Sequence, residues 1–395
     1  MKKKKILFVI ESLVAAGAEK SLITFLSVLD KNKYDIDLQL FAYGGEFERF
    51  LPLEVNLLPP FGYTNFLQKN ILNQFLSLKI SFIISRWKYS FSIRKKGLLH
   101  KDRARLFWKY VSGRIPRMEK EYDIAVAYAQ DLPTLYVVDK VNASMKIGWV
   151  NVRYTPQGAN FNFYKYYYSQ IDKIVAVSAS AYKEFIEVYP EFKNKMTVIE
   201  DMIDSSLINK LSKEKQHIGY EKGVPALLTV ARLNKPQKGY DISLEACRIL
   251  KDRNIKFKWY AIGRGDYRVE MEKFILKHHL EEYFVFLGTT SNPYPYIKNC
   301  TLYIQTSRHE GFGLSIAEAR ILNRPVVTTE FDAVWAQMVQ GENGIVVPQD
   351  PIAVANAIEQ LLNNQQLYNH IVSYQEKEKK GNIEEIEKFY KIINS

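Results

Sequence analysis

Short apolar runs rich in β-branched residues alternate with longer amphipathic patterns along most of the chain. Such runs, without alternating polar positions, are typical of strands buried on both faces of a parallel sheet. The first series of predicted strands comprises residues 5–10, 36–42, 124–128, 146–149, 174–178 and 196–199. The second comprises residues 226–231, 257–262, 284–287, 302–306, 326–329 and 345–347. Two consecutive series of alternating strands and helices predict an α/β fold of two doubly wound parallel-sheet domains.

The boundary between these domains is predicted from a change in composition. At 395 residues the chain is too long for one ordinary core, and polar residues and lysines replace the apolar pattern over residues 201–222. We therefore predict an N-terminal domain over residues 1–203 and a second domain over residues 204–374. The charged pattern of residues 375–395 predicts a final helix with one apolar face, for which the N-terminal domain is a candidate packing partner.

Cysteine content and hydropathy bear on the compartment. Cys247 and Cys300 both lie in apolar segments, which favours a reducing compartment over a disulfide framework. The N-terminus imitates a secretory signal, but Glu11 interrupts its apolar run. No segment reaches the ~20 apolar residues of a membrane span, since the best candidate, residues 78–87, contains two basic residues. We expect a cytoplasmic protein that does not cross a bilayer.

The net charge of +12 is concentrated in one window. Residues 66–117 contain thirteen Lys or Arg residues and a single acidic residue, Asp102, interleaved with bulky apolar residues. This pattern predicts a basic amphipathic insertion that binds an anionic membrane surface, here at the inner face of the cell membrane. The candidate membrane-facing residues are Arg94, Lys95, Lys96, Arg103 and Arg105. The alternative is a solvated insertion that packs on its own domain. Nucleic acid is not an expected partner, because no recognition motif accompanies the charge.

Loops that follow strands are where open α/β sheets bind ligands. The loop after residues 5–10 contains Gly17 and opens a predicted helix, whose N-terminal amides suit an anion. The loop after residues 226–231 carries Arg232 and Lys238, two cations that we expect to be accessible and that suit a pyrophosphate. A helix cap and ordinary surface charge are the alternatives.

The stretch RHEGFGLSIAEA follows the predicted strand 302–306. Glu310 lies in the loop and Glu318 in the helix that is predicted to follow it. Gly311 and Gly313 allow the backbone to approach a ligand closely with its amides turned outward. Carboxylates accept hydrogen bonds from vicinal diols. A nucleotide sugar, with two sugars and a diphosphate, has the complementary anatomy.

Together these features resemble glycosyltransferase family 4. They are Glu310 and Glu318 with seven residues between them, the upstream Arg232 with Lys238 and Gly239, the glycine loop ahead of Glu19, and GENGIVV at residues 341–347. The resemblance covers residues 224–348 most strongly. It implies a retaining enzyme of the GT-B fold, in which two Rossmann-like domains face a cleft, with no metal and no other cofactor.

The resemblance also implies roles for single residues. Arg232 and Lys238 would hold the diphosphate of the donor, for which a UDP-sugar is favoured, and Gly17 would approach it from the N-terminal domain. The donor sugar would be held by Glu310 and by the backbone amides of Gly311, Phe312, Gly313 and Leu314. Glu318 would bind the ribose hydroxyls. Asn151 stands near the donor sugar where many family members carry a histidine, and asparagine can form hydrogen bonds but cannot carry a proton.

The function expected from these features is transfer of a sugar to a hydroxyl of a membrane-presented or surface glycan, of capsule, exopolysaccharide, teichoic acid or glycolipid type. Glu310, Arg232 and Lys238 are the candidate catalytic residues, and no metal site is predicted. The alternatives are another GT-B enzyme such as a nucleotide-sugar epimerase, a glycosyltransferase acting on a protein or soluble acceptor, and a non-catalytic protein that binds polyanions.

Overall fold

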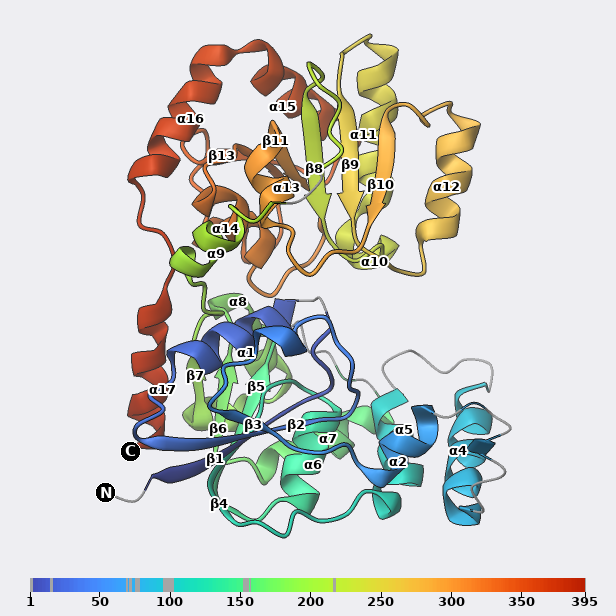
Figure 1. Cartoon of the computed structure of the whole chain (residues 1–395), viewed down its shortest axis with the longest axis vertical. Coiled ribbons are helices and arrows are strands. Elements are labelled where there is room, and N and C mark those ends of the chain that lie inside the picture. Colours follow the sequence, from blue (N-terminus) through green and yellow to red (C-terminus); the bar gives the residue numbers. More distant parts are fainter. Residues whose placement is uncertain are drawn as a thin grey trace. The chain divides into compact units, whose positions relative to one another are not determined.

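The computed structural model describes residues 3–14, 17–68, 70, 73–74, 79–94, 103–151, 156, 158–215 and 218–394. The chain divides into two compact units. Unit 1 comprises the residues up to Asp201 together with those from Glu384 onward, and unit 2 comprises Met202–Ile383. Each unit is built on one parallel sheet with helices packed against it (Figure 1).

In the described part of unit 1, seven parallel strands form a sheet in the order β3-β2-β1-β4-β5-β6-β7. The strands are β1 (Lys4–Ile10), β2 (Tyr34–Leu40), β3 (Val55–Leu57), β4 (Tyr122–Ala127), β5 (Ala143–Val150), β6 (Lys173–Ala176) and β7 (Met196–Val198). The α-helices are α1 (Gly17–Val28), α2 (Gly62–Gln68), α4 (Ile80–Ile93), α5 (Arg103–Val111), α6 (Leu132–Lys140), α7 (Ala159–Ser169), α8 (Ala179–Val188) and α17 (Ile386–Ile393).

Strand β1 shows why an uninterrupted apolar run produces a sheet covered on both faces. Residues 6–10 are at most 2% exposed. Leu7 and Val9 belong to the core cluster that contains Tyr136 of α6. The ring of Phe8 packs instead against Phe25 of α1 and Phe389 of α17, at centroid distances of 5.6 and 6.4 Å. Because successive side chains of a strand point to opposite faces, both faces of β1 are buried.

In the described part of unit 2, six parallel strands form a sheet in the order β10-β9-β8-β11-β12-β13. The strands are β8 (Ala226–Val230), β9 (Lys258–Ile262), β10 (Phe284–Gly288), β11 (Leu302–Gln305), β12 (Val326–Thr329) and β13 (Gly344–Val347). The α-helices are α9 (Ser205–Leu211), α10 (Lys235–Lys238), α11 (Tyr240–Asp252), α12 (Arg268–Lys277), α13 (Tyr294–Asn299), α14 (Leu314–Ile321), α15 (Pro351–Asn363) and α16 (Gln365–Lys377).

The end of the chain is divided between the units, in contrast to the single segment expected from residue 375 onward. Gln375 is fully buried in unit 2, where its Nε2 donates to the carbonyl oxygens of Arg324 at 3.0 Å and Asn343 at 2.8 Å. These bonds hold α16 on unit 2 as far as Lys377. Helix α17 packs in unit 1, with Phe389 fully buried.

The predicted fold class agrees with the observed sheets. Each of the strands predicted from the sequence is present, with ends displaced by at most three residues. The sequence pattern does not predict β3, because its three residues are too few to establish a period. Within the described ranges, no helix combines the length and apolar character needed to cross a bilayer.

Candidate active site

The strand order of unit 2 brings two loops together at one edge of its sheet. Strands β8 and β11 are neighbours, but the chain leaves β8 toward β9 and leaves β11 toward β12, in opposite directions. In open α/β sheets, ligands bind in the crevice at the carboxyl ends of such a pair of strands. The loops after β8 and β11 carry Arg232, Lys238 and Glu310.

Gly239 allows these two segments to approach each other closely. Arg232 lies in an irregular stretch after β8, but Lys238 ends the short helix α10 rather than lying in an open loop. Gly239 follows with φ 62°, and a Cβ atom there would lie 1.9 Å from the carbonyl oxygen of Thr306. No other residue fits this position, so glycine brings Lys238 against the end of β11.

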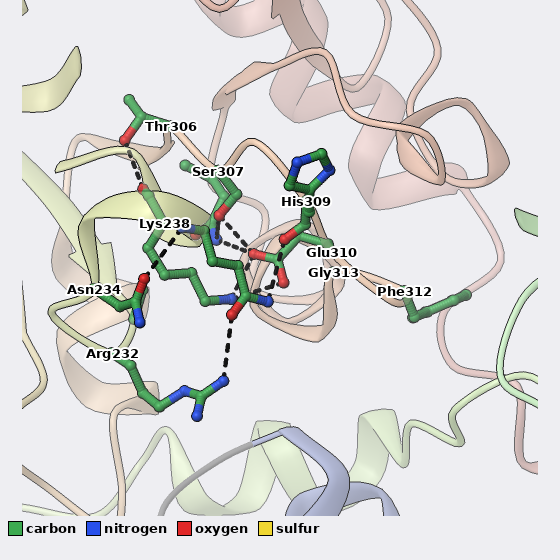
Figure 2. Close-up of polar contacts among 12 residues, drawn as sticks. Arg232, Asn234, Lys238, Thr306, Ser307, His309, Glu310, Phe312 and Gly313 are labelled. Carbon is green, nitrogen blue, oxygen red and sulfur yellow. Dashed lines mark hydrogen bonds and ion pairs between the residues drawn. The ribbon is translucent and has the colours of Figure 1, made fainter. Parts of the chain in front are cut away.

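Lys238 and Glu310 form an ion pair where the two segments meet (Figure 2). Lys238 Nζ donates to Glu310 Oε1 and Oε2, both at 2.7 Å. Glu310 Oε1 also accepts from Gln305 Nε2 at 2.7 Å and from Ser307 Oγ at 2.6 Å. The side chains of Lys238 and Glu310 are only 13% and 9% exposed. The expectation that Lys238 is an accessible cation is therefore corrected, whereas Arg232 is exposed.

The surroundings of Glu310 keep it ionised. Burial alone would raise its pKa, but the charge of Lys238 and the hydrogen bonds from Lys238, Ser307 and Gln305 outweigh burial and lower the pKa below its ordinary value. Glu310 is consequently a fixed acceptor of hydrogen bonds and is unsuited to donating a proton near neutral pH.

A second set of contacts holds the loop after β11 in place. The Arg308 guanidinium donates to both carboxylate oxygens of Asp241 at 2.8 Å, and the Arg308 backbone N–H donates to the Gln237 carbonyl oxygen at 2.7 Å. Gln237 Oε1 in turn accepts from Arg232 Nη2 at 3.4 Å. These bonds join the loop to α10 and α11, so the position of Glu310 relative to Lys238 is fixed from two sides.

Sequence reasoning missed these supporting residues, although one signal was available. Gln305, Thr306 and Ser307 form a polar run at the end of an apolar strand, and each is at most 1% exposed. Buried polar side chains require hydrogen-bond partners. A polar run in a strand predicted to be buried therefore indicates a site whose residues form hydrogen bonds with those side chains. Asp241 and Gln237 gave no comparable signal, because charged and polar residues on helices are usually solvated.

The glycine loop leads into the N-terminus of α14. Gly313 has φ 87° and precedes Leu314, the first residue of that helix. Gln337 Nε2 donates to the carbonyl oxygens of Phe312 and Gly313, the latter at 3.4 Å, while the Phe312 side chain lies apart from the polar cluster (Figure 2). The first amides of a helix have no intrahelical acceptor. The segment from Gly311 to Leu314 therefore offers backbone donors beside Glu310.

Glu318 lies in a different environment from Glu310. It is on α14, is 3% exposed, and its Oε1 accepts from the hydroxyl of Tyr294 on α13 at 3.1 Å. Burial, followed by the charge and hydrogen bond of Glu318, raises the pKa of Tyr294 well above its ordinary value. Tyr294 thus contacts Glu318, whereas Lys238, Gln305 and Ser307 contact Glu310.

Two candidate donor-binding residues lie in unit 1. Gly17 is the exposed first residue of α1. Asn151 follows β5 and is 9% exposed; its Nδ2 donates to the Tyr128 carbonyl oxygen at 2.8 Å and its backbone N–H to Gln130 Oε1 at 3.0 Å. Its Oδ1 is buried and has no partner among the described residues. Asn151 therefore keeps one acceptor available.

The basic window of unit 1 is described in part. Arg94 and Arg103 are exposed, and Lys95 and Lys96 lie outside the described residues. Arg105 is half-exposed, and its Nε donates to the buried Asn160 side chain at 2.6 Å. Its assignment as a membrane-facing residue stays a prediction.

Comparison with known proteins assigns the family. Residues 212–378 match the family model described as glycosyl transferases group 1, and this segment contains Arg232, Lys238, Glu310 and Glu318. The segment over residues 212–378 belongs to the group 1 glycosyltransferases. This family is glycosyltransferase family 4, so the resemblance found in the sequence is confirmed.

The relatives found by sequence are distant. Over 208 residues it is 27% identical to an uncharacterized glycosyltransferase of Methanocaldococcus jannaschii, covering 52% of this chain and 54% of that protein. Over 238 residues it is 25% identical to the poly(ribitol-phosphate) alpha-N-acetylglucosaminyltransferase of Staphylococcus aureus strain COL, covering 59% of this chain and 46% of that protein. The chain spans about half the length of the curated relatives it matches.

Solved structures resemble the chain along nearly its whole length. Anabaena HepE in complex with UDP and glucose has a TM-score of 0.70 at 19% identity and covers 99% of this chain and 100% of its own. TarM, a Staphylococcus aureus protein, has a TM-score of 0.66 at 15% identity and covers 100% of this chain and 99% of its own. At such identities the likeness concerns the fold, and the prediction of two Rossmann-like domains of the GT-B class is confirmed.

The described part of the chain contains no group of three or more His, Cys, Asp or Glu side chains arranged to hold a metal ion. At the carboxyl ends of β8 and β11, the described part of unit 2 brings together the buried Lys238–Glu310 pair, the exposed guanidinium of Arg232 and backbone amides.

Proposed function

We propose that this chain transfers a sugar from a nucleotide-diphosphate sugar to a hydroxyl group of an acceptor, with retention of configuration at the anomeric carbon. The observation that carries the proposal is the Lys238–Glu310 pair at the carboxyl ends of β8 and β11. This pair lies inside the segment that matches the group 1 glycosyltransferases. Family membership supplies the reaction class. The pair offers a cation to the diphosphate and a carboxylate to the sugar hydroxyls.

The two cations would stabilise the leaving group. A lysine ammonium has three N–H donors, of which Lys238 uses two on Glu310 and keeps one for a phosphate oxygen. Arg232 is exposed, and its bond to Gln237 is long at 3.4 Å, so its planar guanidinium is free to turn toward the diphosphate. As the bond between the anomeric carbon and the diphosphate oxygen breaks, negative charge develops on that oxygen. Lys238 and Arg232 stabilise this charge.

The remaining residues would position the donor. Glu310, which is ionised and accepts hydrogen bonds, suits the hydroxyls of the donor sugar, and the amides of Gly311, Phe312, Gly313 and Leu314 suit its other oxygens. We assign the ribose hydroxyls to Glu318, and we keep Gly17 and Asn151, whose Oδ1 is available, as candidate donor-binding residues. Asn151 cannot take up a proton, so the departing diphosphate oxygen accepts the proton of the attacking hydroxyl while that hydroxyl's oxygen bonds to the anomeric carbon.

We propose a UDP-sugar as the donor and a cell-envelope glycan or lipid-linked glycan as the acceptor. The structurally similar HepE holds UDP and glucose. Relatives by sequence include a capsular polysaccharide biosynthesis glycosyltransferase of Staphylococcus aureus, 26% identical over 219 residues, and the poly(ribitol-phosphate) enzyme. The basic window of residues 66–117 supports an acceptor presented at the anionic inner face of the cell membrane.

A nucleotide-sugar panel tests the donor assignment. Sugars linked to UDP, GDP and ADP are compared by thermal unfolding of the full chain, since a ligand at 100 times its Kd stabilises the folded state by about 2.7 kcal/mol. The donor that binds is then incubated with glycan acceptors, and the anomeric configuration of the product is read by NMR. Arg232→Ala should lower turnover by about 10²- to 10³-fold, whereas Lys235→Ala, an exposed cation of the same segment, should not.

Three outcomes would refute the proposal. The first is that no nucleotide sugar stabilises the chain. The second is that the donor is returned as an epimer with no glycosylated acceptor, which would indicate an epimerase. The third is that Arg232→Ala and Lys235→Ala have the same turnover on the donor that binds.

A further inference from the structure

Helix α4 of unit 1 carries apolar side chains on two opposite faces. On its inner face, the ring of Phe82 lies 5.3 Å from Tyr63 and 5.6 Å from Phe66, both on α2. The ring of Tyr89 lies 5.4 Å from Phe107 of α5. These edge-to-face contacts hold α4 against its own unit, so the orientation of the other face is fixed by packing.

The outer face also carries large apolar side chains. Ile80, Ile84, Trp87 and Phe91 are spaced by four, three and four residues, which places them in one stripe. Their exposed fractions are 66%, 46%, 65% and 71%. We call these four residues the α4 stripe. A helix that is apolar on both faces is normally covered on both, and the described residues do not cover this one.

The charges around the α4 stripe indicate what covers it. Residues 79–94 contain four basic residues and no acidic residue. Lys79, Lys88 and Arg94 are exposed beside the stripe. An occupant that matches both features must offer an apolar layer bordered by negative charge. The interface of an anionic bilayer has this composition, with acyl chains below a layer of phosphates.

A second copy of the chain fits this surface less well. In a two-fold symmetric dimer, the α4 stripe of one copy would face the same stripe of the other. The basic residues that flank it would then oppose one another, with no acidic residue of the segment to separate them. Like charges held together in this way are unfavourable, whereas lipid phosphates neutralise the same residues.

We propose that the α4 stripe inserts into the interface of an anionic membrane, with the axis of α4 parallel to the membrane plane. The helix is about 21 Å long, so its stripe makes an extended contact. The side chains of Ile80, Ile84 and Phe91 reach the acyl boundary, and Trp87 occupies the interfacial depth that indole rings prefer. Lys88 and Arg94 bind the phosphates at the edge of the stripe.

This inference deepens the proposed function and rests on its membrane-presented acceptor. It also makes a separate prediction about the salt dependence of membrane binding. Attachment by charge alone is lost when salt screens the surface. Insertion of apolar side chains is not screened, because it depends on the area removed from water. Binding that depends on the stripe should therefore retain a component that high salt does not remove.

The test compares two triple variants of the full chain. Ile80→Gln, Trp87→Gln and Phe91→Gln together remove three stripe residues. The matched control, Val269→Gln, Leu276→Gln and Ile352→Gln, removes three apolar side chains of unit 2 that are 55%, 61% and 54% exposed. Flotation with phosphatidylcholine vesicles containing about 30% phosphatidylglycerol is measured at about 50 mM and about 500 mM NaCl. Surface charges are weakly screened at the lower concentration and strongly screened at the higher one. Thermal unfolding checks that each variant folds, and Trp87→Gln alone replaces the triple variant if that one does not.

The wild type and the control should float at both salt concentrations, and the stripe variant should lose about ten-fold or more of its vesicle binding at high salt. Nucleotide-sugar hydrolysis should be equal in all three proteins. The inference is overturned if the wild type ignores anionic vesicles, if the stripe variant floats like the control, or if the stripe variant instead dissociates a dimer in solution. Flotation as expected without turnover of any nucleotide sugar would refute the enzymatic proposal and leave the membrane inference intact.

Discussion

Removing one charge of the Lys238–Glu310 pair should destabilise unit 2 about as much as removing both. Glu310→Gln leaves the Lys238 ammonium opposite a neutral amide. Lys238→Met leaves the Glu310 carboxylate with the donors from Gln305 and Ser307, as far as the described residues show. In each single variant a charge that is about one-tenth exposed has lost its partner. The double variant has no such charge, so the effects of the two single changes should not add.

The magnitude follows from the distance and the burial of the pair. At 2.7 Å and an effective dielectric constant of about 20, the attraction between the two charges is about 6 kcal/mol, most of which offsets their desolvation. Breaking a buried pair from one side costs about 3–5 kcal/mol. We take about 3 kcal/mol for each single change, because Lys238 keeps some contact with solvent and Glu310 keeps two hydrogen bonds. A similar total for the double change gives a coupling free energy of about 3 kcal/mol.

The assay is a double-mutant cycle measured by urea unfolding, with hydrogen exchange of peptides from β8 and β11 to follow unit 2 separately. The matched control is the Arg253–Glu359 pair of the same unit, which has the same 2.7 Å distance but side chains that are 35% and 32% exposed. The cycle of Arg253→Met and Glu359→Gln should give less than about 1 kcal/mol of coupling. Equal coupling in both cycles, or additive effects of Lys238→Met and Glu310→Gln, would refute the argument from burial.

Three further changes test other features of the two units. Gly239→Ala should destabilise unit 2 by about 2 kcal/mol or more, measured by urea unfolding, because its Cβ would meet the Thr306 carbonyl oxygen at 1.9 Å. Glu318→Gln should weaken binding of free UDP by about ten-fold in calorimetry, whereas Tyr294→Phe, which removes only the neighbouring hydroxyl, should leave it near the wild-type value. Burial raises the pKa of Asp201 from 3.8 to about 7, so the folded state binds this proton more tightly than the unfolded state and stability is lost as the pH rises from about 4 to 7, by up to about 4 kcal/mol. Asp201→Asn should therefore stabilise the chain at pH 8 and much less at pH 4, and equal stabilisation at both values would contradict this.

The architecture could be predicted because it depends on properties that each segment carries by itself. A run such as residues 6–10 is apolar without interruption, and only a strand covered on both faces accommodates it. The edge strand β3 has no such run, so its pairing with β2 depends on tertiary contacts that the local sequence does not show. The end of α16 could not be predicted either, because it depends on hydrogen bonds from Gln375 to the carbonyl groups of Arg324 and Asn343. These two residues are distant from Gln375 in the sequence.

The candidate site could be predicted in its members but not in its geometry. Strand ends and the family resemblance selected Arg232, Lys238 and Glu310. The sequence could not show that Lys238 is buried against Glu310, because that depends on the approach of Gly239 to Thr306 across two segments. The same reason explains why the bond of Arg105 to Asn160 was not predicted. A basic residue in a basic window has no local feature that distinguishes a solvated side chain from one bonded to a distant Asn160.

The position of α17 has a consequence for the order in which the two units complete their folding during synthesis. Phe389 is fully buried in unit 1, with its ring 4.9 Å from Phe25 and 6.3 Å from Trp149. A ribosome adds about 5–20 residues per second. It therefore synthesises Phe25 and Trp149 long before it synthesises residues 386–393. Unit 2 is continuous in sequence and can complete its core first, whereas the earlier-made sheet must wait for a helix translated after the whole of unit 2. During that interval the apolar face of Phe8 and Phe25 is uncovered, so a nascent chain stalled after residue 383 should be a better chaperone substrate than the finished protein.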